Sequence, residues 1–172
     1  ILQDIGVAEA SEYASLKQRF ADKLDIHTPY GSLLQVIEVP TVDGEPFSWH
    51  VCNPLAMLYL LCKESPEFAS LLQSSRQSDA GYRVALYTDE TTPGNNMHPD
   101  VPKESQCFYW SLHELPDWFR SSQGGWFHFS ICKTLDQHRI KGGLGGLLKK
   151  VLRSFFPESG HSFRNGLRLP DG

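Results

Sequence analysis

The sequence has no long hydrophobic run and no N-terminal secretory signal. Its longest apolar stretch, around Leu55 to Cys62, is far shorter than the ~20 residues that an α-helix needs to span a bilayer. We therefore expect an intracellular protein without a membrane span. An initiator methionine is also lacking and the chain stops at RLPDG, so we interpret it as a piece of a longer polypeptide. Its expected partner is another protein or the remainder of that chain.

The sequence lacks paired cysteines, and the spacing of the four that it has does not indicate a metal site. The four cysteines lie in apolar segments, and no two of them form a C-x-x-C pair. A zinc site or a disulfide framework normally shows paired or regularly spaced cysteines. The pattern favours reduced, buried thiols in an intracellular protein. The four are Cys52, Cys62, Cys107 and Cys132.

Several familiar catalytic motifs are missing. The glycine-rich stretch 141–146, KGGLGG, is not followed by the Gly-Lys-Ser/Thr of a phosphate-binding loop, which favours a flexible lead into a helix. There is no G-x-S-x-G, so a nucleophilic serine on a strand-to-helix turn has no support. The seven histidines form no H-E-x-x-H motif. A catalytic Cys–His pair stays open, with nothing in the sequence to favour it.

Charge is unevenly distributed along the chain. Residues 133–172 contain eight Lys or Arg and three Asp or Glu, a net charge of +5, so the preceding residues carry −9. A basic segment on an acidic body can mark a surface that faces nucleic acid. The alternative is a solvated helix face followed by an exposed tail. If DNA is the partner, the candidate contact residues are Lys141, Lys149, Lys150 and Arg153.

Residues 1–76 are predicted to form a mainly helical N-terminal part. Residues 8–24 have the spacing of an amphipathic helix. The β-branched runs on either side of Asp43-Gly44 predict a hairpin at 33–51, because Asp-Gly is a strong turn signal between two strands.

Two helix starts follow this hairpin. Asn53-Pro54 and Ser65-Pro66 each combine a side chain that caps a helix with a proline suited to the first helical position. We expect two short helices set at an angle. The polar, turn-forming stretch 74–81 then marks the best internal boundary.

Residues 77–172 are predicted to form a β-β-β-α unit with a basic C-terminal segment, so that the whole chain is α+β. Aromatic and β-branched runs predict strands at 82–88, 105–113 and 125–132, which should pair as an antiparallel meander. Residues 144–156 predict an amphipathic helix that packs on this sheet. Its predicted apolar face is Leu144, Leu147, Leu148, Val151, Leu152, Phe155 and Phe156, with Lys149, Lys150 and Arg153 in solvent.

Two adjacent carboxylates, Asp89 and Glu90, end the first of these strands. A carboxylate at a strand end beside an open loop suits Mg²⁺ or Mn²⁺, because these hard cations prefer oxygen ligands. Successive residues on a strand point to opposite faces, so only one of the two can share a side with Tyr87. The alternative is that Asp89 closes the strand without binding a metal.

Several stretches of the chain support a resemblance to known sequences. They are TPYG, FSWHVCNPLAMLYLLCKESPEF, LYTDETTPGN, FYWSLHELP, GWF and GHSFRNGLRL, within residues 28–169. These stretches resemble transposon-derived open reading frames of the kind abundant in dinoflagellate algae. More distantly, an aspartate-bearing strand, a Y-x-S-x-x-E-L-P strand and a third strand are similar to those of KDZ-type transposases.

The resemblance implies a partial RNase H-like core and the chemistry of a DDE/D transposase, in which three acids hold two Mg²⁺ ions. Only Asp89 matches an acid of that family, the one on the first core strand. The second and third acids should lie further downstream. Asp136, Glu158 and Asp171 do not occupy such positions.

Two hypotheses about function follow. The first is a non-catalytic structural or interaction domain derived from a transposase-like protein, which needs no cofactor. The second is the N-terminal part of a metal-dependent DDE/D transposase or nuclease that acts on DNA in the nucleus, with Asp89 catalytic and bound to Mg²⁺ or Mn²⁺. Because the acid set is incomplete, we favour the first hypothesis for this chain.

Overall fold

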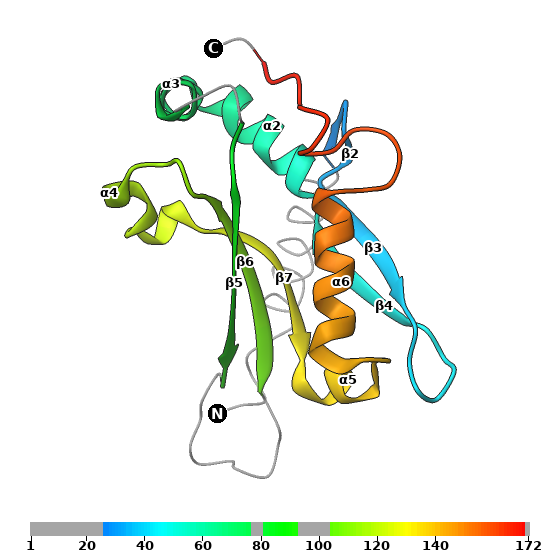
Figure 1. Cartoon of the computed structure of the whole chain (residues 1–172). Helices are drawn as coiled ribbons and strands as arrows, with labels where there is room; N and C mark the ends of the chain where they lie inside the picture. The colour runs from blue at the N-terminus through cyan, green and yellow to red at the C-terminus, as the bar shows by residue number, and fades with distance from the viewer. Residues whose placement is uncertain (1–25, 77–80, 93–103, 171–172) are drawn as a thin grey trace, which may run out of the picture.

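The computed structural model describes residues 26–76, 81–92 and 104–170, which form an α+β fold of short helices and antiparallel sheets (Figure 1). The predicted helix at 8–24 lies outside these ranges. None of the helices within them is long and apolar enough to cross a membrane. In chain order the elements are β1 (His27–Thr28), β2 (Gly31–Ser32), β3 (Leu34–Val39), β4 (Phe47–Cys52), α2 (Pro54–Glu64), α3 (Pro66–Ser75), β5 (Val84–Thr91), β6 (Ser105–Leu112), α4 (Asp117–Arg120), the 3-10 turn η1 (Gln123–Gly125), β7 (Phe127–Lys133), α5 (Thr134–Arg139) and α6 (Gly143–Phe155).

The predicted hairpin is confirmed as β3 and β4, which pair antiparallel from Leu34 opposite Cys52 to Val39 opposite Phe47. Gly44 in its turn has a φ of 92°, a conformation that glycine adopts without steric cost. The Asp43 carboxylate accepts hydrogen bonds from the Thr41 hydroxyl and from Arg139 Nε (2.9 Å), and these bonds lower its pKa. The Arg139 bond ties the hairpin turn to α5.

Both predicted helix starts are confirmed. Asn53 Oδ1 accepts hydrogen bonds from the N–H groups of Leu55 (3.1 Å) and Ala56 (3.4 Å) at the start of α2. Ser65 Oγ accepts one from the N–H of Phe68 (3.1 Å) at the start of α3. Each cap satisfies backbone donors that the helix leaves without partners.

The predicted meander is also confirmed, since β5, β6 and β7 form an antiparallel sheet in that order. Tyr87 lies opposite Tyr109, and Tyr109 lies opposite His128. Leu86 lies opposite Trp110, whose ring contacts Phe155 of α6 at 5.3 Å between centroids. Side chains alternate along a strand, so the Leu86 face of the sheet is the one that α6 covers.

The β3–β4 hairpin lies beside β7 without joining its ladder (Figure 1). Two side chains make the connection. The Trp49 indole N–H donates to the carbonyl of Ile131 (3.1 Å), and the Ser130 hydroxyl donates to the carbonyl of His50 (2.5 Å). Helix α6 packs over both the hairpin and the meander, so one core serves all of these elements. Its largest fully buried side chains are Trp49, Trp110, Phe129, Phe155, Leu112, Leu115 and Leu147.

The predicted apolar face of α6 is partly wrong. Leu147, Val151 and Phe155 are fully buried, but Leu152 is 47% exposed and Phe156 is 37% exposed. Each residue turns a helix by about 100°, so Leu152 lies roughly 140° around the axis from Leu147. This angle places Leu152 outside the part of the helix surface that packs on the sheet. An apolar stripe wider than the surface it packs on leaves its outer residues in solvent.

The glycine-rich stretch before α6 is a tight turn rather than a flexible lead. Gly142 caps the helix with a φ of 82°, and Gly143–Gly146 already belong to its first turns. A Cβ on Gly146 would lie 2.3 Å from the carbonyl oxygen of Lys141. Glycine is needed there because any side chain would push the turn away from the helix.

The buried and exposed leucines of α6 should differ in their effect on stability. Leu147→Ala leaves a cavity in the core and should lower the free energy of unfolding by about 2–5 kcal/mol. Leu152→Ala should change it by less than about 0.5 kcal/mol, as is usual for surface positions. Chemical denaturation of both variants measures this contrast. Equal losses would mean that α6 packs through a different face.

A second prediction concerns the ion pair at the start of β5. Arg83 Nε donates to Glu114 Oε1 (2.8 Å), and the Arg83 backbone N–H donates to Glu114 Oε2 (2.8 Å). Burial raises the pKa of Glu114, but these hydrogen bonds outweigh it and the pKa is lowered overall. The Glu114 side chain is only 5% exposed, so Arg83→Met should cost about 1–3 kcal/mol at neutral pH.

That loss should depend on pH. A carboxyl whose folded pKa is depressed contributes stability above its unfolded pKa and loses this contribution as pH falls. The deficit of Arg83→Met should therefore shrink as the pH falls through the ordinary range of a glutamate. Urea unfolding at several pH values tests this. Arg153→Met is the control, because Glu158, its partner at 3.8 Å, is 89% exposed. A deficit that does not vary with pH would assign the loss to packing alone.

Candidate functional site

Asp89 lies on β5 opposite Cys107 of β6, two residues before the strand ends. Its side chain is on the face of Tyr87, since the two positions alternate with Leu86. A hydrogen bond to Asp89 raises the pKa of the Tyr87 phenol. Asp89 therefore points away from α6, into the solvent-facing side of the sheet.

The neighbouring acids do not gather around Asp89. Because β5 continues to Thr91, Glu90 points to the opposite face, as expected for successive strand residues. Glu104 lies three residue steps along the chain from Cys107, roughly 10 Å for an extended strand. Asp100 falls outside the described ranges. Within those ranges, no group of three or more His, Cys, Asp or Glu side chains could hold a metal ion.

Aromatic side chains line the sheet face that carries Asp89. Tyr87 stacks on Tyr109 (6.3 Å between centroids) and also contacts Trp126 (5.7 Å). Tyr109 in turn meets the ring of His128, whose pKa burial lowers. The aromatic residues in these three segments of the sequence predict the strands. They do not predict that the rings gather on the sheet face that carries Asp89.

Three of the four basic candidates meet on α6. Lys149 and Arg153 are exposed and one helical turn apart, about 6 Å along the axis. Lys150 is half-buried, and its Nζ donates to the backbone carbonyl of Glu38 on β3 (2.8 Å). Lys141 lies at the other end of the helix, roughly 12 Å from Lys149. The structure thus groups Lys149, Lys150 and Arg153 and separates Lys141 from them.

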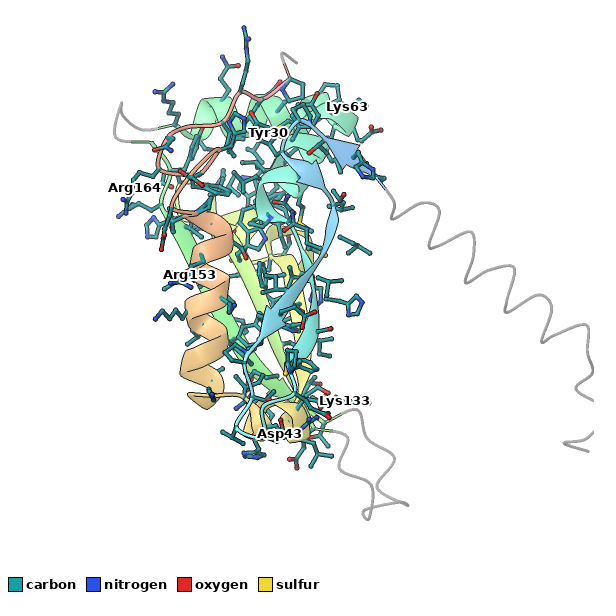
Figure 2. All side chains as sticks on the ribbon, turned by 90° about the vertical axis from the view of Figure 1, so that its right-hand side faces the viewer. Tyr30, Asp43, Lys63, Lys133, Arg153 and Arg164 are labelled. Carbon is teal, nitrogen blue, oxygen red and sulfur yellow. The ribbon has the colours of Figure 1, made fainter. Side chains whose placement is uncertain are left out.

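A cleft of about 380 Å³ opens beside this basic group, between α6, β3 and the segment that follows Pro157. Lys150 and Arg153 line one wall, and Tyr30 and His161 line another. Figure 2 looks onto this side of the molecule, with Tyr30 near the end of the domain and Arg153 on α6. The sequence does not identify Tyr30 or His161 as binding residues, because the cleft forms between segments that lie far apart in the chain.

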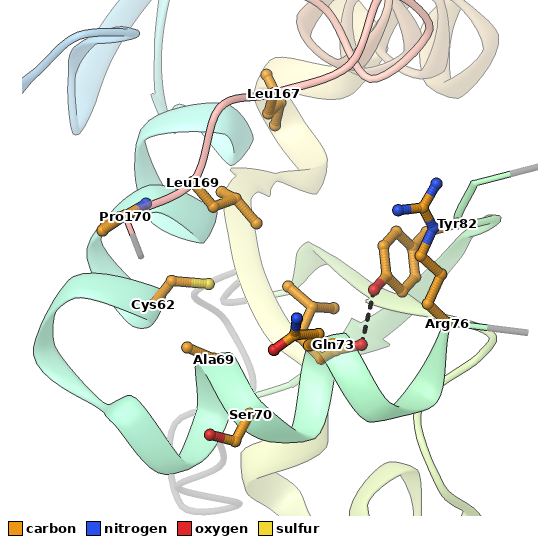
Figure 3. A pocket seen from close by; sticks show the side chains of 10 residues that line it. Cys62, Ala69, Ser70, Gln73, Arg76, Tyr82, Leu167, Leu169 and Pro170 are labelled. Atoms are coloured by element: carbon orange, nitrogen blue, oxygen red, sulfur yellow. Dashed lines mark hydrogen bonds between the residues drawn. The ribbon is translucent and has the colours of Figure 1, made fainter. Parts of the chain in front are cut away.

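A second cavity of about 450 Å³ lies between α2, α3 and the C-terminal segment (Figure 3). Tyr82 donates a hydrogen bond from its hydroxyl to the carbonyl of Leu72 (2.6 Å) on its wall. Burial raises the pKa of the Cys62 thiol to about 11. A thiol with such a pKa stays protonated at neutral pH and is a poor nucleophile.

Comparisons with protein-family models, with curated proteins and with solved structures found no match to this chain. The chemistry of the site therefore has to be argued from its own residues. Asp89 and the basic group of α6 lie on opposite sides of the sheet, because α6 covers the Leu86 face. A ligand bound to the basic group of α6 would therefore not contact Asp89.

Proposed function

We propose that this chain is a non-catalytic interaction domain, derived from a transposase-like protein, that binds nucleic acid along the basic side of α6. The observation that carries the proposal is the clustering of Lys149, Lys150 and Arg153 on one side of this helix. Phosphate backbones attract such groups, because binding releases the counterions condensed on the nucleic acid. Arg153 and Arg164 both project on the side that carries α6 (Figure 2).

The proposed origin rests on the resemblance in sequence and is supported by the order of elements. An antiparallel meander followed by a helix on one face is compatible with the first half of an RNase H-like core. On this proposal β5 corresponds to the first core strand and Asp89 to its acid. The protein would act in the nucleus, with another protein or the remainder of a longer chain completing the assembly.

Absence of catalysis is proposed from the placement of the acids. Two-metal phosphoryl transfer needs several carboxylates that converge on a pair of cations about 4 Å apart. Asp89 is the one residue that the resemblance identifies, and Glu90 beside it points to the other face. The basic side of α6 is also directed away from Asp89. Binding, rather than cleavage, is what this arrangement supports.

The proposal predicts that DNA binding depends on the charges of α6. Replacing Lys149 and Arg153 with glutamine should weaken binding of a 20-base-pair duplex at least 5-fold at low salt. The slope of log K against log salt should also become shallower, by about 0.9 for each phosphate that the variant no longer neutralises. Fluorescence anisotropy measures both quantities. Lys150 is left unchanged so that its hydrogen bond to β3 stays in place.

The matched control removes two exposed lysines elsewhere, with Lys63→Gln at the end of α2 and Lys133→Gln at the end of β7. It changes the net charge by the same amount. An equal loss of affinity in the two double variants would mean that binding follows net charge alone, and the α6 surface would have no special role.

The nuclease alternative makes a different prediction about divalent cations. Mg²⁺ and Mn²⁺ need several oxygen ligands in octahedral array, and a lone carboxylate holds them weakly. We expect a calorimetric titration with Mn²⁺ to show no binding in the micromolar range. Micromolar binding that Asp89→Asn abolishes and Glu90→Gln leaves intact would establish the metal site and overturn the non-catalytic proposal.

A further inference from the structure

We propose that the cleft beside α6 binds a single unpaired nucleotide, with its phosphate at Lys150 and Arg153 and its base against Tyr30 and His161. The inference rests on the proposed nucleic-acid binding and specifies it. It concerns the cleft of about 380 Å³ that α6, β3 and the segment after Pro157 enclose. Binding pockets for small molecules start at roughly 300 Å³, so this volume suits one nucleotide rather than a duplex.

The phosphate end of the cleft is defined by its cations. Lys150 and Arg153 are three residues apart on α6, so their side chains lie on neighbouring positions of one helical face. The Glu38 side chain accepts a hydrogen bond from the Ser48 hydroxyl (2.7 Å), and Glu158 lies 3.8 Å from Arg153 and is 89% exposed. An exposed carboxylate at that distance neutralises little of the charge.

The N-terminal end of α2 adds to the positive potential. Asn53, its cap, and Leu55 in its first turn both line the cleft. The aligned peptide dipoles of a helix place partial positive charge at this end, which favours an anion nearby. Lys150 and Arg153 supply the full charges, and the start of α2 contributes a fixed dipole.

The aromatic end is held in a fixed orientation. The Tyr30 hydroxyl donates to the backbone carbonyl of Arg168 (2.6 Å). The Tyr30 ring contacts His161 edge-to-face at 5.1 Å and Tyr59 at 5.8 Å. Unpaired bases stack on such side chains, whereas bases within a duplex are already stacked on each other. This favours single-stranded over double-stranded ligands.

Two side-chain amides can contact the base edge. Gln35 lines the cleft and makes no hydrogen bond from its side chain within the described part of the chain. Asn53 also lines it, but its Oδ1 already accepts hydrogen bonds from the N–H groups of Leu55 and Ala56. Its Nδ2 donates to the carbonyl of Tyr30 (2.8 Å), so its amide can offer a ligand only its second N–H. The Gln35 amide offers both a donor and an acceptor, the pattern that base edges require.

The test compares His161→Ala with the double variant Lys149→Gln/Arg153→Gln. His161 is exposed, so its removal should leave the fold intact, which thermal unfolding checks. Fluorescence anisotropy is measured with a labelled 12-nucleotide single strand and with a labelled 20-base-pair duplex. We expect His161→Ala to weaken the single strand at least 5-fold and the duplex less than 2-fold. The double variant should weaken both.

The outcomes separate this inference from the function on which it rests. If His161→Ala affects neither ligand while the double variant weakens both, the nucleotide site is wrong and the basic surface stands. If the double variant matches its Lys63→Gln/Lys133→Gln control, the proposed function is wrong. If His161→Ala weakens both ligands equally, the cleft does not select an unpaired base and the inference fails.

Competition identifies the source of the nucleotide. Adenosine monophosphate, adenosine and inorganic phosphate are each added to the labelled single strand. The monophosphate should compete at least 10-fold better than either part alone, because only it occupies both ends of the cleft. If adenosine monophosphate binds, loses this binding in His161→Ala, and does not displace the strand, the ligand of the cleft is a free nucleotide. That result would overturn the strand-binding inference. Equal competition by phosphate alone would overturn it as well.

Discussion

The placement of Trp49 is the interaction on which the rest of this structure depends. Its ring is fully buried and meets Phe108 and Phe129 edge-to-face, while its indole N–H bonds the carbonyl of Ile131. These contacts hold the β3–β4 hairpin against β7, where no backbone ladder does so. Because the hairpin packs against β7, its strand β3 faces α6. Lys150 of α6 can then donate to the carbonyl of Glu38, and the cleft forms between β3 and α6.

The elements that can be predicted from the sequence are those whose signals are local. Asn53-Pro54 and Ser65-Pro66 indicate two helix starts, and Asp43-Gly44 indicates the hairpin turn. These signals act through hydrogen bonds and backbone angles within a few residues, so no knowledge of the tertiary structure is needed.

What cannot be predicted depends on contacts between distant segments. The spacing of α6 does not reveal where its partner surface ends, so the prediction that Leu152 belongs to the core is wrong, and Leu152 is largely exposed. The bond between Trp49 and Ile131 joins residues 82 positions apart, and no periodicity encodes it. The cleft wall that Tyr30 and His161 share cannot be predicted either, because these two residues also lie far apart in the chain. The basic group, by contrast, can be found from charge alone, because its three members lie close together on a single helix.

The two sides of the sheet carry different chemistry, and the proposed function depends on this difference. Asp89 and the aromatic rings of Tyr87 and Tyr109 lie on one side, and α6 with its cations lies on the other. A nuclease would need its acids and its DNA-contacting cations to meet at one place. Here the sheet separates them. The proposed interaction domain uses the side of α6, and Asp89 takes no part in the binding.

The most direct test is to map which side of the sheet contacts nucleic acid. Amide chemical shifts of the ¹⁵N-labelled protein, followed during titration with DNA at low salt, distinguish the two sides residue by residue. We predict that the largest changes occur on α6 around Lys149 and Arg153 and near His161. Changes centred on Tyr87, Asp89 and Tyr109 would contradict the proposed function and place the DNA on the opposite side of the sheet.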